Sequence, residues 1–328
     1  MIFTDESLLP YKVGGLLYTP AINTEIAEKI KNEAFPCLTS LALCLEDAVR
    51  DNAVEQAENA LKNTLCELKT LSENAEIPLI FARIRTPEHL SHIHEFLGEN
   101  EEILTGYILP KFDLSNAEEY AELIAKFNAN RAKKLYMMPI IESGAAAEIS
   151  RRTETLCGIK KILDSIKPFV LNVRVGGNDF SNLYGLRRSV SQNIYEIGVI
   201  RDILVDIINV FASDYVVSSA VWEYFGEDEN GDWARGLKRE IELDKLNGFI
   251  GKTAIHPSQL PIIFDSLKPS CADFDDARNI LSWNDEQSGV AKSSDGNRMN
   301  ELKTHGKWAE RIIRLAKIYG VKNDENLV

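Results

Sequence analysis

Eight short apolar segments that alternate with polar, helix-like stretches constrain the fold of this chain more than any other feature of its sequence. Each segment is nearly uninterrupted over roughly five to eight residues and rich in branched side chains, a pattern typical of strands buried on both faces of a parallel sheet. The sequence therefore predicts an α/β fold. The segments lie near residues 16–21, 41–48, 79–85, 106–111, 134–143, 169–177, 215–224 and 248–257.

The stretches between these segments carry apolar residues at intervals of three and four, which is the spacing of one face of an α-helix. Examples lie at residues 23–35, 52–71, 116–132 and 196–212. Eight strands alternating with helices predict a (β/α)₈ TIM barrel, and 328 residues suit one such barrel with additions. A doubly wound open sheet is the alternative that the same alternation permits.

The tail of the chain departs from this alternation. A helical segment near 273–287 precedes a Gly- and Ser-rich stretch at 288–300, which we expect to be a mobile loop, and a last helix is expected near 303–319. We therefore predict a catalytic barrel over residues 1–268. Residues 269–328 are predicted to be a C-terminal helical flap that is not an independent domain.

The charge and cysteine content restrict the partners and the compartment. A net charge of −13 argues against a nucleic acid or an anionic membrane as partner, although a local site for a small anion remains compatible with it. The first residues do not resemble a signal peptide, and no segment is long and apolar enough for a membrane span. The 5 cysteines are scattered, which is typical of a reducing compartment. We expect a cytoplasmic protein.

Charged and polar residues gather where the predicted strands end. In a (β/α)₈ barrel the active site lies at the carboxyl ends of the strands. Burial of unpaired charge is costly, so residues of both signs at these ends indicate a site for a metal and an anionic substrate. The residues are Glu46, Asp47, Arg83, Arg85, Lys111, Glu142, Asn178, Asp179, Lys252 and His256.

Two carboxylates are the candidate metal ligands. Glu142 closes one apolar segment, and Asp179 follows Gly176 and Gly177, which let the backbone turn sharply or approach a ligand closely. Two carboxylates on neighbouring strand ends suit Mg²⁺, and the absence of His and Cys from these loops disfavours zinc. The alternatives are a carboxylate at a helix N-terminus for Glu142 and a simple Asx turn for Asp179.

Three further residues are candidates for substrate binding or catalysis. Arg83 is the better placed of the two arginines at its strand end to bind a carboxylate through two hydrogen bonds. Lys111 either neutralises a carboxylate or enolate of the substrate or pairs with Glu142 or Asp47. His256 is the only histidine at a strand end, and a supporting, hydrogen-bonded role is expected for it.

Short motifs occur in a fixed order along almost the whole chain. They are LLYTPA at 16–21, CLEDAV at 44–49, FARIR at 81–85, LPK at 109–111, MPIIESG at 138–144, GGNDF at 176–180 and GKTAIHPSQL at 251–260. Together they resemble the citrate lyase β-subunit branch of the HpcH/HpaI aldolase family, whose members are barrels of the phosphoenolpyruvate/pyruvate type. CLEDAV and GKTAIHPSQL are the most specific matches.

The resemblance implies a Mg²⁺-dependent carbon–carbon bond lyase that acts on a small oxo- or hydroxy-carboxylic acid, or on its CoA thioester, through an enolate. It implies metal ligation by Glu142 and Asp179, with Mn²⁺ as a substitute for Mg²⁺. The tail resembles a flap that covers the site of a neighbouring subunit, which implies a homo-oligomer, a trimer or hexamer. The implied catalytic residues are Arg83, Asp47, Glu46 and Lys111, and the implied substrate-binding residues are Arg83, Gly177, Asn178, Arg187 and His256.

The sequence also departs from this family. Gly14 stands where the family has an arginine, which weakens the case for a CoA thioester. Arg187 and Arg188 motivate an alternative, an enzyme that handles phosphoenolpyruvate or another phosphate. A second alternative is a non-catalytic scaffold subunit of a stress-response complex. The departures resemble those of lyase-like proteins encoded near tellurite-resistance genes, and we expect a divergent subgroup.

Overall fold

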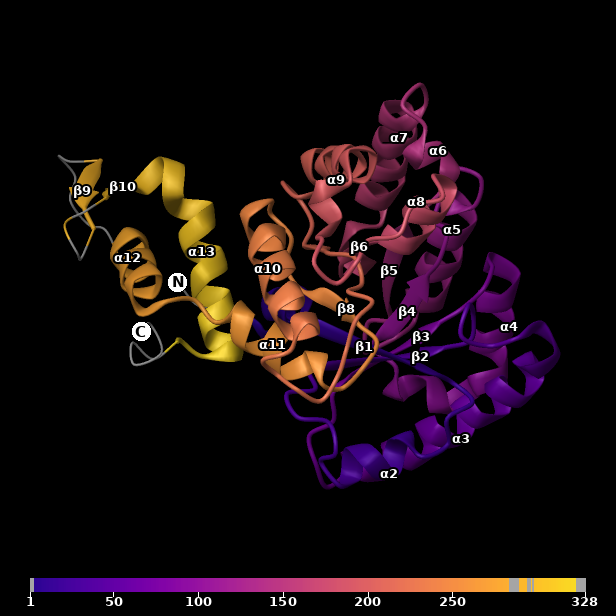
Figure 1. The fold of residues 1–328 in the computed structure, drawn as a ribbon. Helices are drawn as coiled ribbons and strands as arrows, with labels where there is room; N and C mark the ends of the chain where they lie inside the picture. Colours follow the sequence, from indigo (N-terminus) through magenta and orange to yellow (C-terminus); the bar gives the residue numbers. More distant parts are fainter. Residues whose placement is uncertain (1–2, 283–288, 294–295, 297, 323–328) are drawn as a thin grey trace.

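The computed structural model describes residues 3–282, 289–293, 296 and 298–322, and these fold into the predicted barrel (Figure 1). The eight parallel strands pair in the order β7-β6-β5-β4-β3-β2-β1-β8, and a parallel bridge from Ser219 to Lys252 joins the two ends of this row. Each strand coincides with one of the eight apolar segments, and β1 and β2 begin one residue before theirs. The strands are β1 Gly15–Pro20, β2 Ser40–Cys44, β3 Leu79–Arg83, β4 Gly106–Leu109, β5 Tyr136–Ile141, β6 Val173–Val175, β7 Val217–Ser218 and β8 Lys252–Ala254.

Helices follow the strands and cover the outside of the barrel (Figure 1). The helices that belong to the barrel are α1 Asp5–Lys12, α2 Ile26–Lys31, α3 Val54–Ser72, α4 Pro87–Leu97, α5 Ala117–Asn128, α6 Gly144–Ala147, α7 Arg152–Ser165, α8 Gly177–Leu183, α9 Gly198–Phe211, α10 Asp232–Leu246 and α11 Gln259–Leu267. None of the helices in the described part of the chain has the length and apolar character needed to cross a membrane.

Two apolar cores hold the barrel together. The larger lies between the strands and the surrounding helices, and the smaller fills the barrel interior around Leu16, Phe81 and Ile140. Side chains alternate between the two faces of a strand, so the residue two positions further along also points inward. Phe81 is therefore followed inward by Arg83. This alternation places polar side chains directly beyond the apolar interior, at the carboxyl ends of the strands.

The C-terminal extension consists of α12 Cys271–Leu281, the antiparallel strands β9 Val290–Lys292 and β10 Met299–Glu301, and α13 Leu302–Tyr319. The prediction of a mobile loop at 288–300 was therefore wrong for its described residues, although residues 288, 294, 295 and 297 lie outside them. The hairpin is anchored because the Arg298 guanidinium pairs with Asp276 at 2.6 Å and with Asp273 at 2.8 Å, both on α12. The predicted helix near 273–287 is α12 as far as Leu281, and residues 283–287 lie outside the described part of the chain.

The last helix fastens this extension to the amino-terminal side of the barrel. The Tyr319 hydroxyl donates a hydrogen bond of 2.6 Å to the backbone carbonyl of Tyr11, next to the end of α1. Gly14 lies nearby with a φ of 53°, and a Cβ at this position would approach the Tyr319 hydroxyl oxygen to 2.3 Å. The glycine that departs from the family pattern therefore makes room for α13.

Candidate functional site

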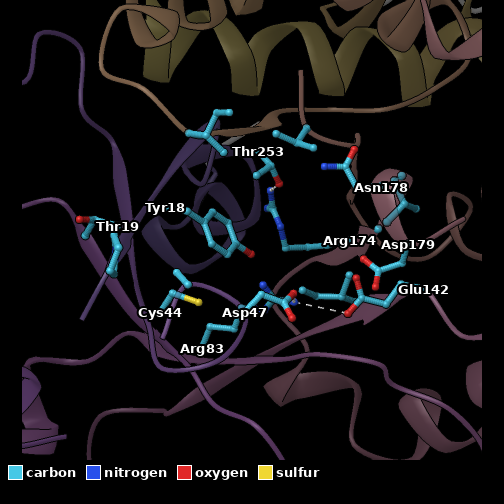
Figure 2. Close-up of a pocket in the computed structure, with 18 residues that line it drawn as sticks. Tyr18, Thr19, Cys44, Asp47, Arg83, Glu142, Arg174, Asn178, Asp179 and Thr253 are labelled. Atoms are coloured by element: carbon cyan, nitrogen blue, oxygen red, sulfur yellow. Dashed lines mark hydrogen bonds and ion pairs between the residues drawn. The ribbon is translucent and has the colours of Figure 1, made fainter. Parts of the chain in front are cut away.

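A pocket of about 380 Å³ opens at the carboxyl ends of the strands, where the barrel fold predicts an active site. Its wall contains residues from β1, β2, β3, β5, β6 and β8 and from the loops that follow them. Figure 2 shows side chains of both charges directed into this space. The polar residues that matter most below are Tyr18, Arg83, Glu142, Arg174, Asp179 and Thr253.

Glu142 follows the last residue of β5 and is 5% exposed. The backbone N–H of Lys111 donates a hydrogen bond of 2.8 Å to Glu142 Oε1. Lys111 has a φ of 47°, a left-handed conformation that is uncommon for a residue with a side chain. Burial raises the pKa of Glu142 to about 8, while the nearby Arg83 lowers it and Asp179 raises it further. A bound cation would offset the cost of holding this carboxylate ionised.

Asp179 stands in the first turn of α8, immediately beyond β6. β5 and β6 are neighbours in the sheet, and their ends are in register through Ile141 and Val175. This register brings the carboxyl groups of Asp179 and Glu142 close together on one side of the pocket (Figure 2). The backbone can pass close to Glu142 because residue 176 is a glycine: a Cβ there would lie 2.1 Å from Glu142 Oε2.

The donor set of this acidic pair fits Mg²⁺. Both groups are carboxylates, and Mg²⁺ is usually held in proteins by one or two carboxylates together with water and substrate oxygens. Within the described part of the chain, no group of three or more His, Cys, Asp or Glu side chains could hold a metal ion. The pair is therefore suited to a cation that shares its coordination with a ligand, rather than to a fully enclosed structural site.

Arg83 and Lys111 bind two further carboxylates beside this pair. Arg83 Nη2 lies 2.8 Å from Glu46 Oε2, 3.1 Å from Asp47 Oδ2 and 3.6 Å from Glu142 Oε1. Lys111 Nζ lies 2.5 Å from Glu46 Oε1 and 3.6 Å from Asp47 Oδ1, so its ammonium pairs with Glu46 and Asp47 and only its backbone bonds Glu142. Burial raises the pKa of Glu46, and Arg83 opposes this rise.

Arg85 fixes the loop that carries Glu46 and Asp47. Its guanidinium donates to the backbone carbonyls of Leu45 at 2.8 Å and Val49 at 2.6 Å, one on each side of the two acids. Arg85 therefore acts through the loop and has no contact with the acidic pair. Arg83 is the arginine of this strand end that lines the pocket.

Some residues predicted from the sequence lie in the pocket wall and others lie outside it. Gly177 and Asn178 line the pocket, whereas Glu46 and Lys111 stand behind Arg83 and Asp47. Arg187, whose side chain is 77% exposed, lies 3.5 Å from Glu223 and is not among the lining residues.

Three other basic residues that the sequence analysis considered interact with side chains outside the pocket wall. His256 stacks on Phe225 with ring centroids 4.4 Å apart, outside the pocket wall. Lys252 is the first residue of β8, so its expected place at the carboxyl end of a strand was wrong. Its buried ammonium binds Glu240 at 2.9 Å and Asp244 at 2.8 Å, both on α10, which packs beside this strand. Arg188 binds the same Glu240 at 3.3 Å.

Four polar residues of the pocket wall were not predicted from the sequence: Tyr18, Thr19, Arg174 and Thr253. Arg174 stands in the middle of the apolar strand β6, where an unpaired charge is costly, and this cost is the signal that could have identified it. Tyr18 and Thr253 carry no such signal, because both residue types are common in strands.

The barrel and its charged pocket define an α/β-barrel enzyme with its active site at the carboxyl ends of the strands. The sequence model of the family of C–C bond lyases of the TIM-barrel fold matches residues 7–321 of this chain. The chain therefore belongs to this family and is a carbon–carbon lyase, which confirms the predicted resemblance. Among curated proteins, none matches this sequence.

Solved structures show the same fold. CitE of Mycobacterium tuberculosis, in complex with magnesium, acetoacetate and coenzyme A, matches with a TM-score of 0.61 and 20% identity over 93% of this chain and 99% of that chain. A citrate lyase from Burkholderia xenovorans has a TM-score of 0.67 and 16% identity, covering 94% and 93% of the two chains. RipC from Yersinia pestis has a TM-score of 0.55 and 18% identity, covering 80% and 99%.

Proposed function

We propose that this protein cleaves a carbon–carbon bond of a small oxo- or hydroxy-carboxylic acid with the help of Mg²⁺ held by Glu142 and Asp179. The juxtaposition of these two carboxylates at the ends of neighbouring strands carries the proposal. The structures of M. tuberculosis CitE with magnesium and pyruvate, and of the M. tuberculosis citrate lyase beta subunit with oxaloacetate and magnesium, support it by analogy. When bound, Mg²⁺ would supply Lewis-acid stabilisation of negative charge on a substrate oxygen.

The chain's own residues would bind the substrate and balance the charge that cleavage creates. Arg83 is charged and buried, and it binds a substrate carboxylate and attracts the negative charge that develops on the enolate fragment. Asp47 and Glu46 hold the Arg83 guanidinium in place, and Lys111 holds Glu46. Gly177 and Asn178 form the wall beside Asp179 and exclude water from that side of the substrate.

The two arginines that suggested a phosphate-handling enzyme lie outside the pocket wall. That alternative depended on Arg187 and Arg188, which are paired with Glu223 and Glu240 and do not line the pocket. A CoA thioester would place its acyl group in the same pocket. Residue 14 lies at the amino end of β1, opposite to the pocket, so the missing family arginine does not alter the pocket wall.

Calorimetric titration with Mg²⁺ and oxalate, a stable analogue of an enolate, tests the proposed metal site. We expect Mg²⁺ to bind and oxalate to bind much more tightly in its presence, with Mn²⁺ able to replace it. A set of oxo-acids, hydroxy-acids and their CoA thioesters incubated with Mg²⁺ should then yield cleavage products. If oxalate affinity does not respond to either cation, the proposed function is wrong.

We also propose that the chain forms a homo-oligomer, a trimer or hexamer, in which the extension from α12 to α13 covers a neighbouring subunit's site. In support, none of the described residues beyond Ile255 lines this pocket, and α13 packs near the amino end of β1. Light scattering of the purified protein should give the mass of three or six chains. A monomeric mass would contradict this proposal and would leave the metal proposal unaffected.

A further inference from the structure

Arg174 is the part of the pocket that the proposed cleavage does not use. It is 1% exposed, stands in the middle of β6 and belongs to the pocket wall. Its Nη2 donates a hydrogen bond of 2.8 Å to the Thr253 hydroxyl. Its Nε and Nη1 have no hydrogen-bond partner anywhere in the described part of the chain. Two guanidinium donors are thus buried and available at the wall of a cavity.

The other buried arginines of the described residues all have an acidic partner within the chain. They are Arg83, Arg152 and Arg188, and each forms an ion pair with a carboxylate of the chain. Arg152 also donates to two backbone carbonyls. Arg174 has no acidic partner among the described residues, so these do not offset the cost of burying its charge. An anion from outside the chain would offset that cost.

The position of Arg174 defines where such an anion would bind. Figure 2 shows its guanidinium beside Thr253, with Tyr18 directed toward it, while Glu142 and Asp179 lie on another side of the pocket. The pocket therefore has two polar ends, one formed by the acidic pair with Arg83 and one formed by Arg174. A ligand that satisfies both ends must carry a polar group at each.

We propose that Arg174 and Thr253, next to Tyr18, form a second anion subsite, which makes the ligand of this pocket a dicarboxylate. One carboxylate binds at the acidic pair and Arg83, and the other receives hydrogen bonds from Arg174 Nε and Nη1. A carboxylate fits because it is planar, accepts two parallel hydrogen bonds and carries the compensating charge that a neutral thioester lacks. The assignment of the first carboxylate rests on the proposed function, and that of the second does not.

A matched pair of acids tests the subsite. Malate and 2-hydroxybutyrate share the same carbon chain and hydroxy-acid end, and differ in one terminal group, a carboxylate or a methyl. In calorimetric titrations, the wild-type protein should bind malate about 10- to 100-fold more tightly, the effect of a charge-assisted hydrogen-bonded pair. Arg174→Met should bind the two acids equally. Arg174→Lys should retain only part of the preference, because an ammonium lacks the guanidinium fork.

Two control variants separate the effect of Arg174 from a general loss of positive charge and from misfolding. Arg201→Met removes the same charge from the outer face of α9 and should leave the preference unchanged. If Arg174→Met does not fold, Thr253→Val, which removes one hydroxyl from the subsite, should still reduce the preference for malate. Equal binding of the two acids by the wild type, or an unchanged preference in Arg174→Met, would overturn the subsite.

Repeating the titrations in EDTA distinguishes this subsite from the proposed metal function. If the metal function alone fails, Mg²⁺ will strengthen the binding of neither acid, and malate will remain preferred. If the subsite alone fails, Mg²⁺ will strengthen the binding of both acids equally. The two failures therefore give different results in the same experiment.

Discussion

Replacing Glu142 with Gln should abolish Mg²⁺ binding and lower lyase turnover by about 1000-fold, the upper end of the loss seen when a group that supports transition-state charge is removed. Gln keeps the size of the side chain and can still accept the hydrogen bond from the backbone N–H of Lys111, which is 2.8 Å long. It removes the negative charge that a divalent cation requires. Asp179→Asn should also abolish Mg²⁺ binding and lower turnover, because it removes the charge of the second carboxylate of the pair.

Glu148→Gln is the matched control for this charge change. Glu148 follows α6, six residues beyond Glu142, and its side chain is 54% exposed. Its replacement should leave Mg²⁺ affinity, turnover and the melting temperature unchanged. Calorimetry with Mg²⁺ and oxalate, followed by turnover on the substrate identified by screening, measures both effects. Wild-type Mg²⁺ affinity in Glu142→Gln and in Asp179→Asn would show that these carboxylates are not the metal ligands.

The positions of the strands and of the acidic pair were predictable because both follow from local patterns. Each apolar segment contained a strand, and the strands are shorter than the segments because residues such as Glu46 and Arg85 already belong to the loops. In a parallel barrel the carboxyl ends of consecutive strands meet at one edge. Glu142 and Asp179 therefore had to lie close together once β5 and β6 were neighbours.

The direction of the remaining side chains could not be predicted, because it depends on packing between distant segments. His256 turns away from the pocket to stack on Phe225, a residue of the loop between β7 and α10. Lys252 binds Glu240 and Asp244 because α10 packs beside β8. The register of β6 against its neighbours decides whether Arg174 faces the barrel interior or the helices, and the sequence of β6 alone does not specify that register.

Replacing Arg83 with Met should lower both turnover and stability. Turnover should fall by about 100- to 1000-fold, because the charge that opposes the developing enolate is lost. The free energy of unfolding should fall by about 3–5 kcal/mol, since removal of one partner leaves a buried charge uncompensated. The group left uncompensated is Glu142, which lies 3.6 Å from Arg83 Nη2 and is 5% exposed, whereas Glu46, at 2.8 Å, keeps its ion pair with Lys111. Urea unfolding and steady-state kinetics measure the two losses.

Two companion variants separate the structural role of Arg83 from its proposed catalytic role. Arg83→Lys keeps the charge but loses the fork that binds a carboxylate bidentately, so it should recover most of the stability and little of the turnover. In the double variant Arg83→Met/Glu142→Gln, the buried negative charge is also removed, and the stability should recover further than additivity predicts. Full turnover in Arg83→Lys would show that only the positive charge of Arg83 is needed, to hold Glu46 and Asp47. Another residue of the pocket would then have to bind the substrate carboxylate.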